Sequence, residues 1–177
     1  MFNIDCKLLL DAMNYYESLG YKPIKAPMLV DRDSLEITLP ADVHPKRHMS
    51  KYYVGSAEQS FYQLLKEGLN PEGSYMLITP CERDDIESDS HLNIFLKVEL
   101  ISVIKFTEEI LTDVSNFYKN QNFNPETVYT ETGFDINING IEVGSFGDRL
   151  LDGRWIVYGT GLALPRIDFA LEQGLGL

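Results

Sequence analysis

The stretch CERDDIESDSHLNIFLKVEL, from Cys81 to Leu100, decides the fold that we expect for this chain. Its second half alternates between apolar and other residues, so residues 93–102 predict a β-strand with one face in the core. One side of this strand carries Ile94, Leu96, Val98 and Leu100, and the other side carries Phe95, Lys97 and Glu99. Residues 74–83 predict another strand, and the acidic segment between them makes the region a hairpin.

Two side chains of this hairpin suit a nucleotide. Arg83 ends the first strand, where its guanidinium can hold a phosphate, and Phe95 on the return strand can stack against a base. An exposed hairpin in which Arg83 pairs with Asp84 or Asp85 explains the same residues without a ligand. Taken by itself, the segment leaves both interpretations open.

Composition and charge exclude several classes of protein. The chain has 177 residues, 44% of them hydrophobic, which suits one folded domain and excludes a disordered tail. Its 15 basic and 27 acidic residues give a net charge of −12, which disfavours binding to a phosphate backbone. No apolar run is long enough to span a membrane, and the first residues do not read as a signal peptide. Cys6 and Cys81 form no CxxC pair, so we expect a cytoplasmic protein without a disulfide scaffold or zinc site.

Hydrophobic spacing and the positions of glycine and proline outline the other elements. Helices are expected over residues 4–19, 57–67 and 103–117 and from about residue 164, and residues 31–50 read as a long polar loop. A short extended piece is expected over residues 21–30, and most of the chain after residue 125 reads as strand, with turns at Asn139-Gly140 and Asp152-Gly153. This order predicts a single α+β domain over residues 1–177 with a mainly antiparallel central sheet flanked by helices.

The segment FDININGIE, residues 134–142, predicts a hairpin with a two-residue turn at Asn139-Gly140. Asn137 then pairs with Glu142, and strand alternation puts Asp135 on the same face. Two carboxylates and an amide on one face are hard oxygen ligands that suit Mg²⁺, with phosphates completing its coordination. A solvated face of an amphipathic hairpin is the alternative.

A third segment, GTGLALPR from Gly159 to Arg166, has a glycine-containing strand that runs into a helix. Glycines let a ligand approach the backbone, and Arg166 can clamp a phosphate. The segment fits neither GxGxxG nor a P-loop, which excludes the common dinucleotide and P-loop sites. His44 and His48 stand alone in the polar loop, where an ordinary loop or a lid is favoured over a metal site.

Taken in order, these segments resemble the catalytic core of class II aminoacyl-tRNA synthetases. The similarity is greatest to the aspartyl, asparaginyl and lysyl subgroup and to the related ammonia-dependent asparagine synthetase. The family's first motif looks like helix 4–19 and the strand containing Pro27, the second like residues 81–99, and the third like residues 159–166. Between the second and third motifs the family has two Mg²⁺-binding acids seven residues apart, which Asp135 and Glu142 match.

The resemblance implies a role for each matching residue at the nucleotide end. Arg83 would hold the α-phosphate of ATP, and His91 would lie near the γ-phosphate. Phe95 would stack on adenine from one side and Arg166 from the other, while Asp85 would help to read the adenine or the amine of the substrate. Arg83 and Arg166 would act in catalysis by stabilising the charge that develops on phosphate.

For the amino acid, Ser56-Ala57-Glu58 resembles the loop whose acid or amide holds the α-amino group, so Glu58 is the candidate. Arg149 matches the arginine that holds the side chain of aspartate or asparagine, and a bulge at Gly144 or Gly147 must bring it to the face of Glu142. We also expect Glu99 and Ser145 to contact the amino acid.

Phe61 and Tyr62 stand where aspartyl enzymes have a lysine after this loop. Without that lysine, aspartate, asparagine or a related amino acid remains open as the substrate.

The implied activity is ATP-dependent, Mg²⁺-assisted activation of an Asp- or Asn-like amino acid to an aminoacyl-adenylate. The motifs occupy these 177 residues and leave no anticodon-binding domain, so the expected acceptor is ammonia, a small molecule or a carrier protein rather than tRNA. The first motif forms the dimer interface in the family, which implies a homodimer. The alternatives are amidation of aspartate, as in asparagine synthetase, a non-catalytic binding or regulatory paralogue of the fold, and a truncated gene fragment.

Overall fold

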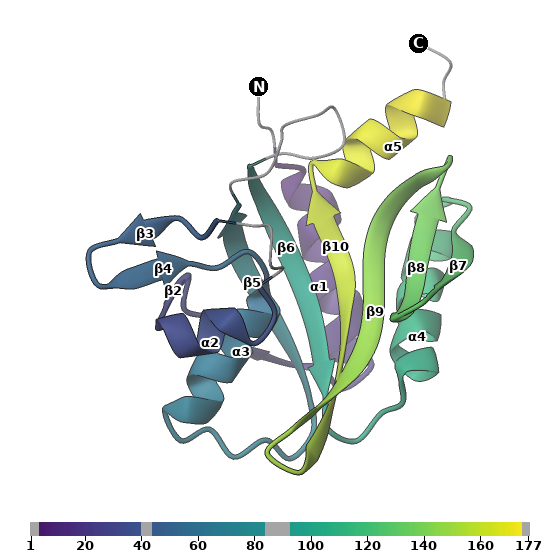
Figure 1. Cartoon of the computed structure of the whole chain (residues 1–177). Coiled ribbons are helices and arrows are strands. Elements are labelled where there is room, and N and C mark those ends of the chain that lie inside the picture. Colours follow the sequence, from purple (N-terminus) through teal and green to yellow (C-terminus); the bar gives the residue numbers. More distant parts are fainter. Residues whose placement is uncertain (1–3, 40–43, 84–92, 175–177) are drawn as a thin grey trace.

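A seven-stranded, mostly antiparallel sheet forms the centre of the computed structural model, which describes residues 4–39, 44–83 and 93–174 (Figure 1). The strands lie in the order β1-β5-β6-β10-β9-β8-β7, and β1 pairs with β5 in parallel while the other pairs are antiparallel. Their bounds are β1 Lys22–Ile24, β5 Ser74–Glu82, β6 Ile94–Ser102, β7 Glu126–Thr130, β8 Gly133–Ile138, β9 Ile141–Leu151 and β10 Arg154–Leu164. The expected α+β architecture with a mainly antiparallel sheet is confirmed.

Helices α1 (Cys6–Ser18) and α4 (Thr107–Asn120) cover one face of the sheet (Figure 1). Their apolar stripes pack on the back-facing residues of the strands to form the main core, in which Leu100, Phe146 and Leu162 are fully buried. Tyr16 of α1 is buried in the same cluster, and its hydroxyl donates to the carbonyl of Gly161 at 2.8 Å. Gly161 is the residue that β10 skips in its pairing with β6, so its carbonyl is free to accept this bond.

The opposite face of the sheet is covered only in part. Helix α3 (Ala57–Lys66) packs Phe61 and Tyr62 on Leu77, Ile101 and Ile156 of the sheet. Beside α3 lie α2 (Arg32–Glu36) and a three-stranded sheet of β2 (Leu29–Val30), β4 (Lys51–Tyr53) and β3 (Arg47–His48), whereas α5 (Arg166–Gly174) lies at the other end of the sheet, after β10 (Figure 1). The part of this face that α3 leaves open is where the polar residues of β6, β9 and β10 gather.

The prediction of a long polar loop over residues 31–50 is wrong. The segment contains α2 and β3, and residues 40–43 lie outside the described part of the chain. Helix α2 has only five residues, too few for a periodic pattern, and contacts from α3 hold it in place. The Gln63 side-chain oxygen accepts bonds from the Asp31 amide at 3.0 Å and the Ser34 hydroxyl at 3.1 Å.

Two predicted helix starts also differ. The helix expected from residue 103 begins at Thr107, because Ser102 Oγ accepts bonds from the amides of Ile104 and Lys105 and turns the chain first. The last helix begins at Arg166, since β10 extends to Leu164. Within the described ranges, none of the helices is long and apolar enough to cross a membrane.

Candidate active site

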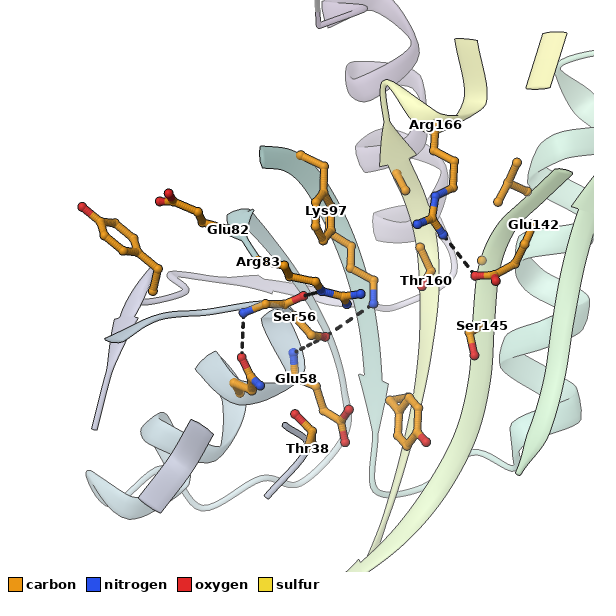
Figure 2. A pocket seen from close by; sticks show the side chains of 18 of the residues that line it. Thr38, Ser56, Glu58, Glu82, Arg83, Lys97, Glu142, Ser145, Thr160 and Arg166 are labelled. Carbon is orange, nitrogen blue, oxygen red and sulfur yellow. Dashed lines mark hydrogen bonds and ion pairs between the residues drawn. The ribbon is translucent and has the colours of Figure 1, made fainter. Parts of the chain in front are cut away.

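A cavity of about 520 Å³ opens on the partly covered face of the sheet. Its wall includes residues from α2, α3, α5, β4, β5, β6, β9 and β10, so most of the chain contributes to it. Seven predicted site residues line this one cavity: Glu58, Arg83, Phe95, Glu142, Ser145, Arg149 and Arg166. Figure 2 shows Arg166 and Glu142 pointing toward each other at one end and Glu58 near Thr38 at the other. Asp85 and His91 lie outside the described residues.

The β5–β6 hairpin holds Arg83 against Phe95. The Arg83 amide donates to the Asn93 carbonyl at 2.8 Å, and its Nε donates to the Gly55 carbonyl at 2.8 Å. Its guanidinium carbon lies 5.1 Å from the centre of the Phe95 ring, a cation–π contact. Among the residues that the structure describes, no carboxylate forms an ion pair with Arg83. As far as the described residues are concerned, its positive charge is therefore left for an anion in the cavity.

The β8–β9 hairpin has the register that the sequence predicts. Asn137 pairs with Glu142, and the turn residues Asn139 and Gly140 both have positive φ, at 52° and 79°. The pairing then skips Val143, so that Asp135 lies opposite Ser145. This bulge, next to the predicted Gly144, reverses the alternation of β9.

The bulge determines which side chains of β9 face the cavity. Without it, Glu142 and Arg149 would point to opposite faces, because they are seven residues apart. With it, Glu142, Ser145 and Arg149 all line the cavity, as expected for a bulge that brings Arg149 to the face of Glu142.

Arg166 and Glu142 join α5 to β9 across the cavity mouth. Arg166 Nη1 lies 3.1 Å from Glu142 Oε1, and both side chains keep access to solvent. The turn of the hairpin is fixed to the same helix, because Asn139 Nδ2 donates to the Ala170 carbonyl at 2.9 Å. The strand that carries Glu142 and the helix that carries Arg166 are therefore held together twice.

Glu142 lies close enough to Asp135 to affect its pKa. Burial and the negative charge of Glu142 raise the pKa of Asp135, and a hydrogen bond from Ser145 opposes this rise. Asp135 does not line the cavity. In residues 4–39, 44–83 and 93–174, no group of three or more His, Cys, Asp or Glu side chains is placed to hold a metal. A cation bound by these two carboxylates would need further oxygen ligands, such as those of a phosphate.

Glu58 stands at the first turn of α3, at the end of the cavity away from Arg166. Its side chain is buried, accepts a hydrogen bond from Tyr62 Oη, and forms an ion pair with Arg149 Nε at 3.2 Å. Burial raises the pKa of Glu58, although Tyr62, Arg149 and Lys97 each favour its charged form. Arg149 also lies over the ring of Tyr158, with its guanidinium carbon 5.7 Å from the ring centre.

A second ion pair lies beside the first. Lys97 lines the cavity, and its Nζ is 2.7 Å from Glu99 Oε2. Ser56, which caps α3, donates to the same oxygen at 2.8 Å, and Figure 2 shows Ser56 and Lys97 pointing toward each other. Glu99 itself is buried beneath them, with 1% of its surface exposed, and does not line the cavity.

Three residues of this end were not among the predicted site residues. Lys97 could have been found, since it alternates with Phe95 and Glu99 on the same strand face. Tyr62 could also have been found, since it stands four residues after Glu58 on the expected helix. Tyr158 carries no local signal, because a tyrosine on a strand can equally belong to the core. Only the tertiary fold brings the ring of Tyr158 against Arg149.

Comparisons by sequence identify no relative of this chain: no protein-family model matches it, and no curated protein matches it. Solved structures do match. The seryl-tRNA synthetase of Pyrococcus horikoshii, complexed with ATP, has a TM-score of 0.75 at 16% identity, covering 94% of this chain and 49% of that one. The cytoplasmic serine-tRNA ligase of Naegleria fowleri, in complex with AMP, has a TM-score of 0.71 at 14% identity, covering 92% and 47%. The pyrrolysyl-tRNA synthetase of Desulfitobacterium hafniense has a TM-score of 0.68 at 15% identity, covering 94% and 68%.

The chain has the fold of the class II aminoacyl-tRNA synthetase catalytic core. It spans about half the length of the two seryl enzymes. At these identities the likeness concerns the fold, so the activity is a matter for proposal. The three structures named above are seryl and pyrrolysyl enzymes, and the closer similarity to the aspartyl, asparaginyl and lysyl subgroup stays a prediction.

Proposed function

We propose that this protein is an ATP-dependent ligase that activates an Asp- or Asn-like amino acid to an aminoacyl-adenylate and transfers it to an acceptor other than tRNA. One observation carries the proposal: a single cavity is lined by Arg83, Phe95 and Arg166 and, further along, by the Glu58–Arg149 pair. The first group suits a nucleotide, and the second suits the charged groups of an amino acid. The fold supports this assignment, since neighbours of the same fold were solved with ATP and with AMP.

At the nucleotide end, Arg83 is the residue that we assign to the α-phosphate. Its guanidinium has no ion-pair partner in the described segments, and the Gly55 carbonyl fixes its Nε. Phe95 would stack on the adenine, and Arg166 would exchange its contact with Glu142 for the nucleotide. The predicted contributions of Asp85 and His91 to ATP binding belong to the same proposal.

At the amino-acid end, Glu58 would accept the α-ammonium group. Arg149, which already lies beside Glu58, would orient the side chain of the substrate together with Ser145. Glu99 would act from beneath by holding Lys97 and Ser56 in place. A zwitterionic substrate held in this way directs its carboxylate toward Arg83, where the α-phosphate is expected.

The reaction joins these two ends. A carboxylate oxygen of the amino acid attacks the α-phosphorus of ATP, and the bond from that phosphorus to the bridging oxygen breaks, which releases pyrophosphate. Arg83 and Arg166 stabilise the negative charge on the phosphate oxygens, and the cavity aligns the attacking oxygen. Asp135 and Glu142 would hold Mg²⁺, which neutralises phosphate charge when it is bound.

ATP–pyrophosphate exchange with each of the twenty amino acids, with and without ammonia, tests the proposal. We expect exchange with a small subset that includes asparagine or aspartate, and loss of at least about 100-fold in Arg83→Ala, a loss of the size seen when one such charge-stabilising donor is removed. Lys119→Ala is the control, since this residue lies at the end of α4 away from the cavity. Binding of ATP without exchange would instead indicate a non-catalytic paralogue.

The Mg²⁺ assignment has its own test. Calorimetry with a non-hydrolysable ATP analogue should show Mg²⁺-dependent affinity that is lost in Asp135→Ala and in Glu142→Ala. Glu126→Ala, on the exposed edge strand β7 of the same sheet, should bind as the unchanged protein does. If both variants still bound the analogue in the same Mg²⁺-dependent way, Asp135 and Glu142 would not be the Mg²⁺ ligands.

A further inference from the structure

Lys97 lies in the cavity wall between the two ends of the candidate site. It stands on β6 two residues after Phe95, which we assign to the adenine, and two residues before Glu99, and strand alternation turns these side chains to one face. Phe95 and Lys97 both line the cavity and stand about 7 Å apart along the strand. Figure 2 draws the ammonium end of Lys97 among the labelled side chains, with Arg83 to one side and Glu58 below. Lys97 therefore occupies the stretch of wall where the proposed nucleotide and amino acid meet.

The floor of the cavity fixes this ammonium in place. Lys97 Nζ lies 2.7 Å from Glu99 Oε2 and donates to Ser56 Oγ at 3.4 Å, while the Ser56 hydroxyl donates to the same Glu99 oxygen at 2.8 Å. The Lys97 side chain is 14% exposed and that of Glu99 only 1%, so the accessible part of the pair is the lysine, in the cavity wall. An ammonium has three N–H donors, and the described residues engage two of them. The third donor is left for a ligand, and the lysine has little freedom to lose when that ligand binds.

The charge of Lys97 reaches both ends of the site. Burial raises the pKa of Glu58 at the amino-acid end, and the charge of Lys97 is among the influences that oppose this rise. Burial also raises the pKa of the Cys81 thiol, which pairs with Phe95 across the strands, and there the charges of Lys97 and Arg83 both oppose the rise. A cation that acts on groups at both ends lies between them, in agreement with its place on the strand.

We propose that Lys97 binds the α-carboxylate of the amino acid and turns it toward the α-phosphate of ATP. This inference rests on the proposed function, in which Glu58 holds the ammonium group and Arg83 the phosphate. Both charged groups of an α-amino acid are attached to one carbon, so the carboxylate of a substrate held at Glu58 lies a short step away, in the direction of Arg83. Lys97 occupies that step.

The register of the sheet favours Lys97 over Arg149 for this role. Lys97 pairs with Ala163 of β10, whereas Arg149 pairs with Ile156. The direction from Ile156 to Ala163 along β10 leads to Arg166, which we assign to the nucleotide. Arg149 is therefore farther from the nucleotide than Lys97 and remains available to the side chain of the substrate.

In the reaction, Lys97 would donate to one carboxylate oxygen and leave the other free to attack. The attacking oxygen forms a bond to the α-phosphorus, the bond to the bridging oxygen breaks, and pyrophosphate leaves with that electron pair, so Lys97 transfers no proton. The carboxylate and the phosphates are both anions, and their repulsion opposes the approach. A cation between them offsets part of this repulsion and fixes the direction of attack.

Amino alcohols separate the carboxylate from the rest of the substrate. Asparaginol and the corresponding alcohol of aspartate keep the ammonium group and the side chain, but have a hydroxymethyl group in place of the α-carboxylate. In calorimetry, which requires no turnover, the unmodified protein should bind asparagine or aspartate at least about tenfold more tightly than its alcohol, as a hydrogen bond between charged groups suggests. Equal affinity for acid and alcohol in both pairs overturns the inference. Absence of binding by all four compounds overturns it together with the proposed amino-acid site.

A double variant tests whether Lys97 causes this preference for acid over alcohol. Lys97→Met alone would leave the buried Glu99 without a counter-ion, so Glu99→Gln is combined with it to remove both charges. In the double variant the preference should fall about tenfold, while the affinity for the alcohol changes little. Glu99→Gln alone keeps the lysine and is the matched control, in which the preference should be at least as large as in the unmodified protein. A folded double variant that keeps the preference overturns the inference.

Pyrophosphate exchange distinguishes this inference from the proposed activity. If the protein catalyses exchange and the double variant keeps both its kcat/KM and its preference, Lys97 has no such role and the ligase assignment stands. A preference that depends on Lys97, without any exchange, would support the inference and contradict the ligase.

Lys97→Arg decides the matter should the double variant fail to fold. This variant keeps the charge in a larger, planar group, so the preference for acid over alcohol should persist. Its kcat should fall about tenfold or more, because the carboxylate is no longer held in line with the α-phosphate. An unchanged kcat in Lys97→Arg, or loss of the preference, overturns the inference.

Discussion

If the protein activates an amino acid as proposed, Glu58 and Tyr62 set how amino-acid binding depends on pH. Burial raises the pKa of Glu58, and the bond from Tyr62 lowers it, because the hydroxyl stabilises the carboxylate. Only the carboxylate can bind the α-ammonium group, so binding is present above this pKa and is lost as the pH falls through it. Tyr62→Phe removes the donor, which raises the pKa of Glu58 and moves the loss of binding to higher pH. Near neutral pH we expect kcat/KM for the amino acid to fall about tenfold, as a hydrogen bond to a charged group suggests.

The pH profile of kcat/KM in pyrophosphate exchange, at saturating ATP, measures this effect. Tyr118→Phe is the matched control, since the Tyr118 hydroxyl is buried in α4 without a hydrogen-bond partner in the part of the chain described. The profile of that variant should be unchanged. An acid limb that stays in place in Tyr62→Phe would show that the hydroxyl does not act through Glu58.

For single residues, the sequence predicts which side chains line the cavity better than it predicts which side chains they contact. Glu58 and Arg149 were expected at one site because they match family positions, Ser145 was expected to contact the same substrate, and all three line the cavity. One partner was predictable, since Tyr62 lies four residues after Glu58 on the same helix. The approach of Arg149 to Glu58 was not, because it depends on how α3 packs on the sheet. The burial of Glu99 beneath Ser56 likewise depends on where α3 begins.

Among the elements, the β8–β9 hairpin and α5 are joined by one turn residue. Asn139 adopts a positive φ of 52° and donates its side-chain amide to Ala170 of α5 at 2.9 Å. Asn139→Gly keeps the turn conformation and removes this bond. Because α5 carries Arg166, we expect a several-fold higher KM for ATP and little change in the KM for the amino acid, consistent with a hydrogen bond worth about 1 kcal/mol.

The two-residue turn between β9 and β10 supplies the control for this experiment. Asp152 has a φ of 49° and precedes a glycine as Asn139 does, but it lies at the opposite end of β9 from α5 (Figure 1). Asp152→Gly should leave both KM values unchanged. If the two substitutions changed the KM for ATP equally, the Asn139–Ala170 hydrogen bond would not be what positions Arg166.

Elements that interact with their sequence neighbours were predicted well, and those set by distant contacts were not. The Asn139-Gly140 turn fixes the register of the β8–β9 hairpin locally, and the alternation of β6 marks its two faces. Helix α2 is too short to give a pattern, and Gln63 of α3 fixes its start. A bulge in β9 could be predicted, because Glu142 and Arg149 must face the same side of the sheet. Its position at Val143 could not be predicted from the sequence.

For the whole molecule, we expect a homodimer formed through α1 and the segment that follows it. Helix α1 buries one side against the sheet but leaves Leu10 54% exposed, and β1 next to it is an edge strand. A two-fold dimer is the commonest assembly of soluble proteins. Light scattering at micromolar concentration should therefore give about twice the monomer mass of 20.2 kDa.

Two substitutions of equally exposed leucines separate an interface from a general surface effect. Leu10→Glu should shift the protein toward the monomer, whereas Leu150→Glu, at a residue 56% exposed on β9, should not. A monomer mass for the unmodified protein would count decisively against the dimer.

The charge of the whole molecule leads to the last prediction, which is weak or absent binding to tRNA. Phosphate contacts supply most non-specific affinity for nucleic acid, and each one needs a lysine or arginine that is free of an acidic neighbour. This chain has 15 basic and 27 acidic residues, and residues 84–89 contain four acids in six positions. Several of its cations are already paired, as Lys66 is with Asp31 and Asp33.

Filter binding of total tRNA at low salt tests this expectation under the conditions most favourable to binding, since salt screens exposed charges beyond roughly 10 Å at 0.1 M. We expect no saturable retention at micromolar protein, while the amino acid alone supports pyrophosphate exchange without tRNA. Adding tRNA should then leave the exchange rate unchanged, because the residues that we propose for both substrates, such as Arg83, Arg166 and Glu58, line this chain's own cavity. Tight retention with a steep decline as salt increases would require a basic surface that the charge count opposes, and it would restore tRNA as the acceptor.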